Sequence, residues 1–146
     1  MHKLFIILLL TLCINGLSAQ TDADILIDKI TGSIAGTWRL IPEKNSKAKK
    51  SEFNISINAV QATETKNLYK MTGTIVGFAI EDGYAYYKGD VLVFGYTRTD
   101  IIEINPMKKV PEYITGSIQD GKLTLITYSP TSPSRIMSGT IWERPN

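Results

Sequence analysis

Apolar and polar residues alternate along much of this chain, and the alternation is clearest at residues 53–59. The apolar residues that share one face of this extended segment are Phe53, Ile55, Ile57 and Ala59. The residues between them are polar. An antiparallel strand with one buried face and one solvated face has this pattern, so we predict a strand here.

Similar short segments recur through the rest of the chain, and no helical period of useful length follows Thr31. Sequences typical of turns separate them, namely Glu81-Asp82-Gly83, Gly89-Asp90, Asn105-Pro106, Asp120-Gly121 and Pro130-Thr131-Ser132-Pro133. The predicted strands are residues 34–40, 53–59, 68–78, 84–88, 91–98, 101–104, 112–118, 123–128 and 135–143. This pattern predicts an all-β domain of about eight or nine antiparallel strands.

A short helix is predicted before the first strand, at residues 22–31. Asp22 or Asp24 is placed to cap its start, and Gly32 stands just past its end. Its apolar side consists of Ile25, Leu26 and Ile30. We expect this side to lie against the strands that follow.

Several predicted strands carry a glycine in a similar local sequence. These sequences are Thr72-Gly73-Thr74-Ile75, Thr115-Gly116-Ser117-Ile118 and Ser138-Gly139-Thr140-Ile141, with Gly36-Thr37-Trp38 as a variant. A glycine inside a strand is unfavourable unless the strand bends or another backbone approaches closely. We therefore predict a strongly coiled sheet that closes into an up-and-down β-barrel, because closure removes exposed edges. A β-sandwich is the competing architecture.

Residues 1–19 have the layout of a secretory signal peptide. A basic start and an apolar run at residues 4–12 precede small residues at Ser18 and Ala19. The apolar run is short for a transmembrane helix, which needs about 20 apolar residues, and an uncleaved anchor is the alternative. We expect an exported protein, periplasmic or extracellular, whose mature chain, residues 20–146, forms one domain.

The single cysteine, Cys13, and the single histidine, His2, lie in the predicted signal peptide. The mature chain therefore has no residue for a disulfide, a Cys or His metal site, or a Cys–His or Ser–His couple. We expect no cofactor and no metal. Without Lys3 the basic and acidic residues nearly balance, so the charge does not indicate a nucleic-acid partner. No later segment is apolar over the length of a membrane span.

Two motifs, Gly36-Thr37-Trp38 and Thr140-Ile141-Trp142-Glu143-Arg144, resemble those of the lipocalin and avidin-like β-barrels, the calycins. Lipocalin-like domains of secreted bacterial proteins likewise begin near a Gly-x-Trp and end in a Trp-x-Arg. The resemblance implies that Gly36 and Trp38 lie at the closed base of the barrel and that Arg144 packs across the indole. A cation over an indole face contributes roughly 0.5–2 kcal/mol. The helical insert of fatty-acid-binding proteins has no counterpart after the first strand.

Aromatic residues on two neighbouring predicted strands are the best candidates for a ligand-facing wall. They are Tyr84, Tyr86, Phe94 and Tyr96. Rings with a few hydroxyls and a cation near the mouth, Lys88 or Arg98, suit a small, largely apolar, amphipathic or carboxylate-bearing ligand inside the barrel. The alternative is an interior only wide enough for side chains, which these rings would fill.

Two other functions stay open at this point. A filled barrel would act as a scaffold whose loops, Lys44 to Lys50 and Pro130 to Ser134, contact a protein or an envelope surface. A carboxylate-dependent hydrolase would need a paired acid and base among residues such as Asp82, Asp90 and Glu112. Turn carboxylates more often bond the backbone, so we expect binding and no enzymatic activity.

Overall fold

The computed structural model describes residues 21–42, 51–104, 107–128 and 136–146. The predicted signal peptide, the lysine-rich loop, the turn Asn105-Pro106 and the loop at residues 130–134 lie outside these ranges.

Helix α2 (Asp22–Ile34) precedes the first strand, as predicted, and a capping box closes its start. The Thr21 hydroxyl accepts a hydrogen bond from the backbone N–H of Asp24 (3.2 Å). The Asp24 carboxylate accepts one in return from the backbone N–H of Thr21 (3.1 Å). Two donors that the first helical turn leaves without an intrahelical partner are thereby satisfied.

The helix ends at Ile34, later than the predicted end at Thr31. Ile30 and Ile34 are both fully buried, and their burial outweighs the cost of about 1 kcal/mol for Gly32 inside the helix. Ile34 therefore belongs to the helix, although the alternation placed it in the first strand.

Nine strands follow the helix. They are β1 (Gly36–Leu40), β2 (Glu52–Ala62), β3 (Tyr69–Ile75), β4 (Phe78–Ala79), β5 (Glu81–Lys88), β6 (Val91–Ile104), β7 (Met107–Gln119), β8 (Lys122–Tyr128) and β9 (Ile136–Glu143).

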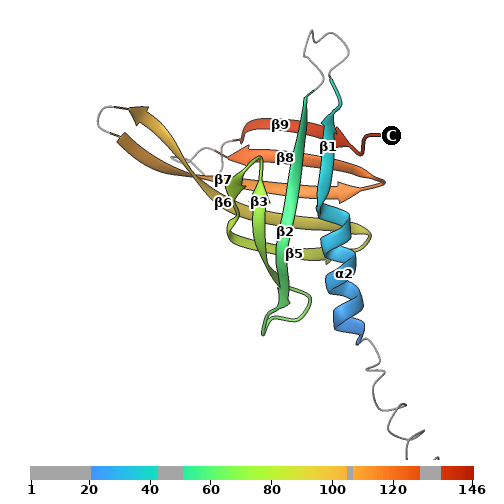
Figure 1. Ribbon diagram of the computed structural model, residues 1–146. Coiled ribbons are helices and arrows are strands. Elements are labelled where there is room, and N and C mark those ends of the chain that lie inside the picture. The colour runs from blue at the N-terminus through green and yellow to red at the C-terminus, as the bar shows by residue number, and fades with distance from the viewer. Residues whose placement is uncertain (1–20, 43–50, 105–106, 129–135) are drawn as a thin grey trace, which may run out of the picture.

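The strands form one antiparallel sheet in the order β2-β1-β9-β8-β7-β6-β5-β3, with the two-residue β4 added to β3. Strand β2 also pairs with β3, so each of the eight strands has a neighbour on both sides and the sheet is a closed barrel. The result is an eight-stranded barrel with one helix before its first strand (Figure 1). The predicted barrel is confirmed, and the alternative of a β-sandwich is wrong.

A turn interrupts the segment predicted as one strand at residues 68–78. Val76 and Gly77 both have positive φ, 53° and 79°, so the chain reverses between β3 and β4. Val76 is 55% exposed, and no core contact opposes the turn.

Pairing with neighbouring strands extends two other predicted segments. The predicted turn at residues 81–83 lies inside β5, where Asp82 has φ 47° and the register with β6 shifts. Residues 91–98 and 101–104 belong to the single strand β6, because β7 pairs with it along its length. This long hairpin projects from the barrel (Figure 1).

The interior of the barrel is apolar, and helix α2 contributes Ile30 and Ile34 to the same core. We call the end where β1 begins, close to the turns after β5 and β7, the helix end. We call the end where β2 begins and β3 ends the far end. The largest fully buried side chains are Trp38, Phe94, Ile30, Ile34, Ile55, Met71, Leu92 and Leu123. Among the described residues, no helix combines the length and the apolar character needed to cross a membrane.

Candidate functional site

Trp38 and Arg144 meet at the helix end of the barrel. The Arg144 guanidinium carbon lies 4.1 Å from the centroid of the Trp38 ring. Its nitrogens donate hydrogen bonds to the backbone carbonyls of Ala35 (2.7 Å), Ser33 (2.9 Å) and Gly32 (3.2 Å). The predicted packing of Arg144 across Trp38 is confirmed.

The same two side chains terminate helix α2. The indole N–H of Trp38 donates to the carbonyl of Ile34 (3.0 Å), beside the carbonyls that Arg144 binds. The last turn of α2 has no basic residue of its own, so Arg144 supplies the positive charge that favours a helix C-terminus. Burial lowers the pKa of the Arg144 guanidinium, which still stays charged.

Gly36 is placed where Arg144 passes over the backbone. Its φ is +112°, and a Cβ at this position would lie 2.5 Å from Nη1 of Arg144. The backbone conformation therefore favours a glycine at Gly36, and a larger residue would also displace the Arg144 guanidinium. These contacts hold Arg144 against the first strand and the end of α2. A second half-open pocket, of about 280 Å³, lies at this end between α2 and the turns after β5 and β7, and its lining includes Lys29, Asp90 and Asp120.

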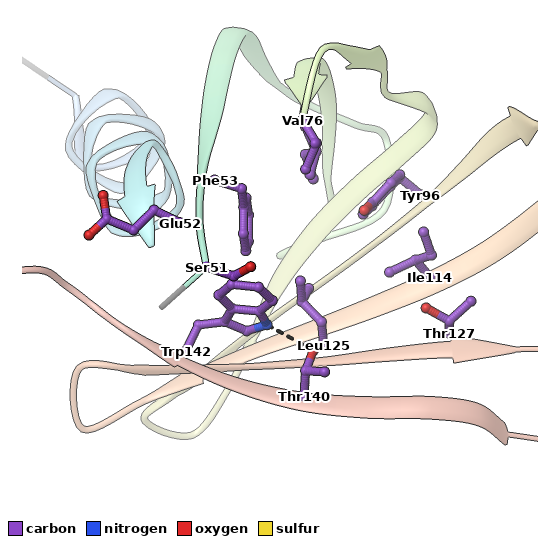
Figure 2. A pocket seen from close by; sticks show the side chains of 11 residues that line it. Ser51, Glu52, Phe53, Val76, Tyr96, Ile114, Leu125, Thr127, Thr140 and Trp142 are labelled. Carbon is purple, nitrogen blue, oxygen red and sulfur yellow. Dashed lines mark hydrogen bonds between the residues drawn. The ribbon is translucent and has the colours of Figure 1, made fainter. Parts of the chain in front are cut away.

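A cavity of about 270 Å³ lies at the far end of the barrel (Figure 2). Residues of β2, β3, β6, β7, β8 and β9 line it, so the barrel wall itself forms the site. The lining residues are Ser51, Glu52, Phe53, Ile75, Val76, Tyr96, Ile114, Leu125, Thr127, Thr140 and Trp142. Three of them, Ser51, Glu52 and Val76, are exposed and form the rim.

Aromatic contacts shape one side of this cavity. The rings of Phe53 and Trp142 meet edge to face, with centroids 4.5 Å apart and planes at 85° (Figure 2). The indole N–H of Trp142 donates to the Thr140 hydroxyl (2.8 Å). Because this hydrogen bond uses the indole donor, the ring offers the cavity mainly an apolar surface.

The cavity holds no described cation among its lining residues. Glu52 at the rim forms an exposed ion pair with Arg39 (2.8 Å), so its charge is balanced outside the cavity. The other polar side chains of the lining include Thr127, which is partly buried. A pocket with this lining favours a neutral ligand.

The structure separates the four residues predicted to line a ligand site. Tyr96 lines the cavity and is 2% exposed, and Phe94 is completely buried in the adjoining core. Tyr84 and Tyr86 instead lie on the outer surface of the barrel, which corrects their predicted position. In β5 the inward residue is Ala85, which is completely buried and pairs with Phe94. The tyrosines on either side of Ala85 consequently point outward.

Most of the cavity wall was not predicted as a site. Phe53 was assigned to the inner face of its strand, and Trp142 was noted only as part of the Trp-x-Arg ending. The other unpredicted lining residues include Ile75, Ile114, Leu125, Thr127 and Thr140. They come together only when strands distant in sequence close the barrel, so alternation within one strand gives no signal for them.

The candidate carboxylates do not form a paired site along β5. Asp82 lies near the start of this strand, and Asp90 lies in the turn after its end. Glu112 lies on another strand, β7. Within the described ranges, no group of three or more acidic, His or Cys side chains is arranged to hold a metal ion.

Fold and pocket together define a closed eight-stranded antiparallel barrel with a helix at one end and, at the other, a small half-open pocket lined by apolar and hydroxyl-bearing residues. The chain matches no protein-family model, and searches of curated proteins and of solved structures found no match.

Proposed function

We propose that this chain is an exported, lipocalin-like (calycin) barrel that binds a small, neutral, largely apolar molecule in the cavity at its far end. The observation that carries this proposal is the lining of the pocket at the far end. Residues of the barrel wall line its half-open space of about 270 Å³, whereas the pocket at the helix end is lined in part by Lys29, Asp90 and Asp120.

The size of the cavity limits the ligand. Typical ligand sites enclose about 300–1,000 Å³, so this cavity stands at the small end of the range. It would enclose a compact molecule and leave a long lipid chain or a haem largely outside.

The lining also limits the chemistry. Phe53, Ile114 and Leu125 would contact apolar surface, and the hydroxyl of Thr127 would orient a polar atom of the ligand. A carboxylate would lose its hydration without gaining a cation, which is unfavourable in an apolar site.

The test uses the mature chain and two matched probes, 1-naphthol and 1-naphthoate, in isothermal titration calorimetry. We expect 1-naphthol to bind about tenfold more tightly than 1-naphthoate, because only the second carries a charge to be desolvated. Thr127→Phe should fill the cavity and abolish binding. Thr72→Phe, at an exposed position on β3, is the matched control and should leave binding unchanged.

Two results would contradict the proposal. The first is equal binding of 1-naphthol to Thr127→Phe and to the unaltered chain. The second is a failure of 1-naphthol and of a panel of other small neutral aromatic and aliphatic compounds to bind at all.

A further inference from the structure

The outer surface of strands β5 to β9 carries a second set of aromatic residues, separate from the cavity. The pairing places outward residues in rows across these strands. One row is Tyr84, Gly95, Thr115, Ile126 and Gly139, and the next toward the helix end is Tyr86, Val93, Ser117, Thr124 and Ile141. The row toward the far end is Thr97, Tyr113, Tyr128 and Ile136. We call these residues the tyrosine face.

The tyrosine face is partly exposed and uncharged. Its residues include Tyr113, Ile136 and Ile141, which are 37%, 57% and 47% exposed. None of its residues is charged. Charges border it: Glu81 pairs with Thr97 at one corner, and the row nearest the helix end carries Lys88, Lys122 and Glu143.

The ring of Tyr84 lies over Gly95 of the neighbouring strand. A Cβ at Gly95 would collide with the hydroxyl end of this ring, so the glycine makes room for it. Tyr86 stacks beside it, with centroids 6.3 Å apart and planes at 14°. The hydroxyls of Tyr84 and Tyr113 are hydrogen-bonded to each other, which restricts the rotation of both side chains.

The remaining rings continue this platform. The Tyr113 and Tyr128 centroids are 5.8 Å apart, with planes at 40°. Burial, together with the Tyr113 hydroxyl, raises the pKa of the Tyr84 phenol, so the group is neutral at physiological pH. The cluster therefore combines aromatic faces with neutral hydroxyl groups.

We propose that the tyrosine face binds a neutral polysaccharide chain. A sugar ring presents C–H groups on its faces and hydroxyls at its edge, and tyrosine offers an aromatic face with a hydroxyl at its tip. Thr115, Ser117 and Thr124 add further hydroxyls between the rings. Four strand spacings span about 19 Å, which accommodates roughly four linked sugars.

Because the tyrosine face is uncharged, it fits a neutral polysaccharide better than a charged partner. Nucleic acid and acidic lipid surfaces are bound mainly through Lys and Arg side chains, and none lies among the rows of the tyrosine face. A second copy of the chain is the remaining candidate for a flat, uncharged face. The cavity shares no residue with this surface, so the proposal is independent of the proposed function.

The experiment is affinity electrophoresis of the mature chain in gels containing soluble neutral polysaccharides, a β-glucan, a xylan and a mannan in turn. We expect at least one to retard the chain, and the retardation to persist in 1 M NaCl because no ion pair is involved. Tyr113→Ala and Tyr86→Ala should each weaken binding about tenfold. Tyr113→Phe, which keeps the ring, should retain most of it.

Phe78→Ala removes an aromatic side chain that is 42% exposed on β4, outside the face, and serves as the matched control. It should leave retardation within about twofold of the unaltered chain, and circular dichroism verifies that each variant is folded. The proposal is overturned if no neutral polysaccharide retards the chain, or if only polygalacturonate or oligo-dT binds and salt abolishes it. Sedimentation showing a dimer that Tyr113→Lys dissociates would assign the face to a second copy instead.

Discussion

Arg144 connects the end of the chain to its beginning. Its guanidinium binds the last carbonyls of α2 and lies across Trp38, the buried aromatic residue of the first strand. An arginine serves both contacts because it is planar, permanently charged and able to donate in several directions at once. One side chain thereby stabilises the helix end, the first strand and the last strand together.

Arg144→Ala should lower the free energy of unfolding by about 2 kcal/mol, through loss of the indole contact and of the bonds to helix carbonyls. Arg144→Lys should recover less than half of this loss, since an ammonium group cannot reach all three carbonyls while stacking on the ring. Urea unfolding followed by far-UV circular dichroism measures both values.

Arg39→Ala is the matched control for this prediction. Arg39 pairs with Glu52 in an exposed ion pair, with side chains 33% and 46% exposed, so its removal should cost about 0–1 kcal/mol. If Arg144→Ala is no more destabilising than Arg39→Ala, the role assigned to Arg144 at the helix end is incorrect.

At the level of the element, the N-terminal end of α2 depends on pH through its capping box. Hydrogen bonds from the side chain and then the backbone of Thr21 lower the pKa of the Asp24 carboxyl below its ordinary value. A carboxyl with a lowered pKa in the folded state stabilises that state above its unfolded pKa. This stabilisation is lost as the pH falls through the lower, folded pKa.

We therefore expect Asp24→Asn to reduce the decline in stability that the unaltered chain shows as the pH is lowered from about 5 to about 3. Thr21→Val, which removes the hydroxyl, should reduce it similarly. Asp22→Asn lies in the same helical turn but outside the capping box, and should keep most of the original decline. Urea midpoints measured across this pH range give the comparison, and identical slopes for all four proteins would refute the assignment.

Alternation along the sequence predicted the strands well, but it did not choose the inner face of β5. Rings occupy one face of this strand at Tyr84 and Tyr86, and alternation alone does not say which face is buried. The choice follows from the size of the cross-strand partners. Phe94 lies inside against Ala85, and Tyr84 lies outside over Gly95. These pairs of large and small residues are visible only when the register is known.

Gly116, on another strand, also has a role that the sequence alone does not reveal. A Cβ there would collide with the ring of Phe94, so the glycine admits a core aromatic side chain. From the sequence we predicted that the strand bends, or that another part of the chain approaches closely, at such glycines. The sequence did not indicate which residue would approach. Gly139 has no comparable neighbour, since a Cβ would lie 4.0 Å from the nearest atom, the Leu125 carbonyl oxygen. Glycines in similar local sequences therefore have different roles in the barrel.

At the level of the whole molecule, the barrel closes where the first and last strands meet. The register between β1 and β9 pairs Arg39 with Glu143 and Leu40 with Trp142, the shortest seam among the eight barrel strands. Trp142 also packs against Phe53 of β2, so it connects the seam to the wall of the cavity. Closure and the proposed ligand site therefore depend on the same residue.

A chain that ends at Ile141 should lose this closure. Without Trp142 and Glu143, β1 has no partner on one side, and the edges of β1 and β9 become exposed. Loss of Arg144 removes the helix-end contacts as well. We expect no cooperative thermal transition by circular dichroism and increased binding of a hydrophobic dye. A chain that ends at Arg144 lacks only Pro145 and Asn146, and it should melt as residues 20–146 do. A cooperative transition retained by the shorter chain would mean that the barrel holds together without the β1–β9 seam, and that the two ends of the chain contribute less to stability than their contacts indicate.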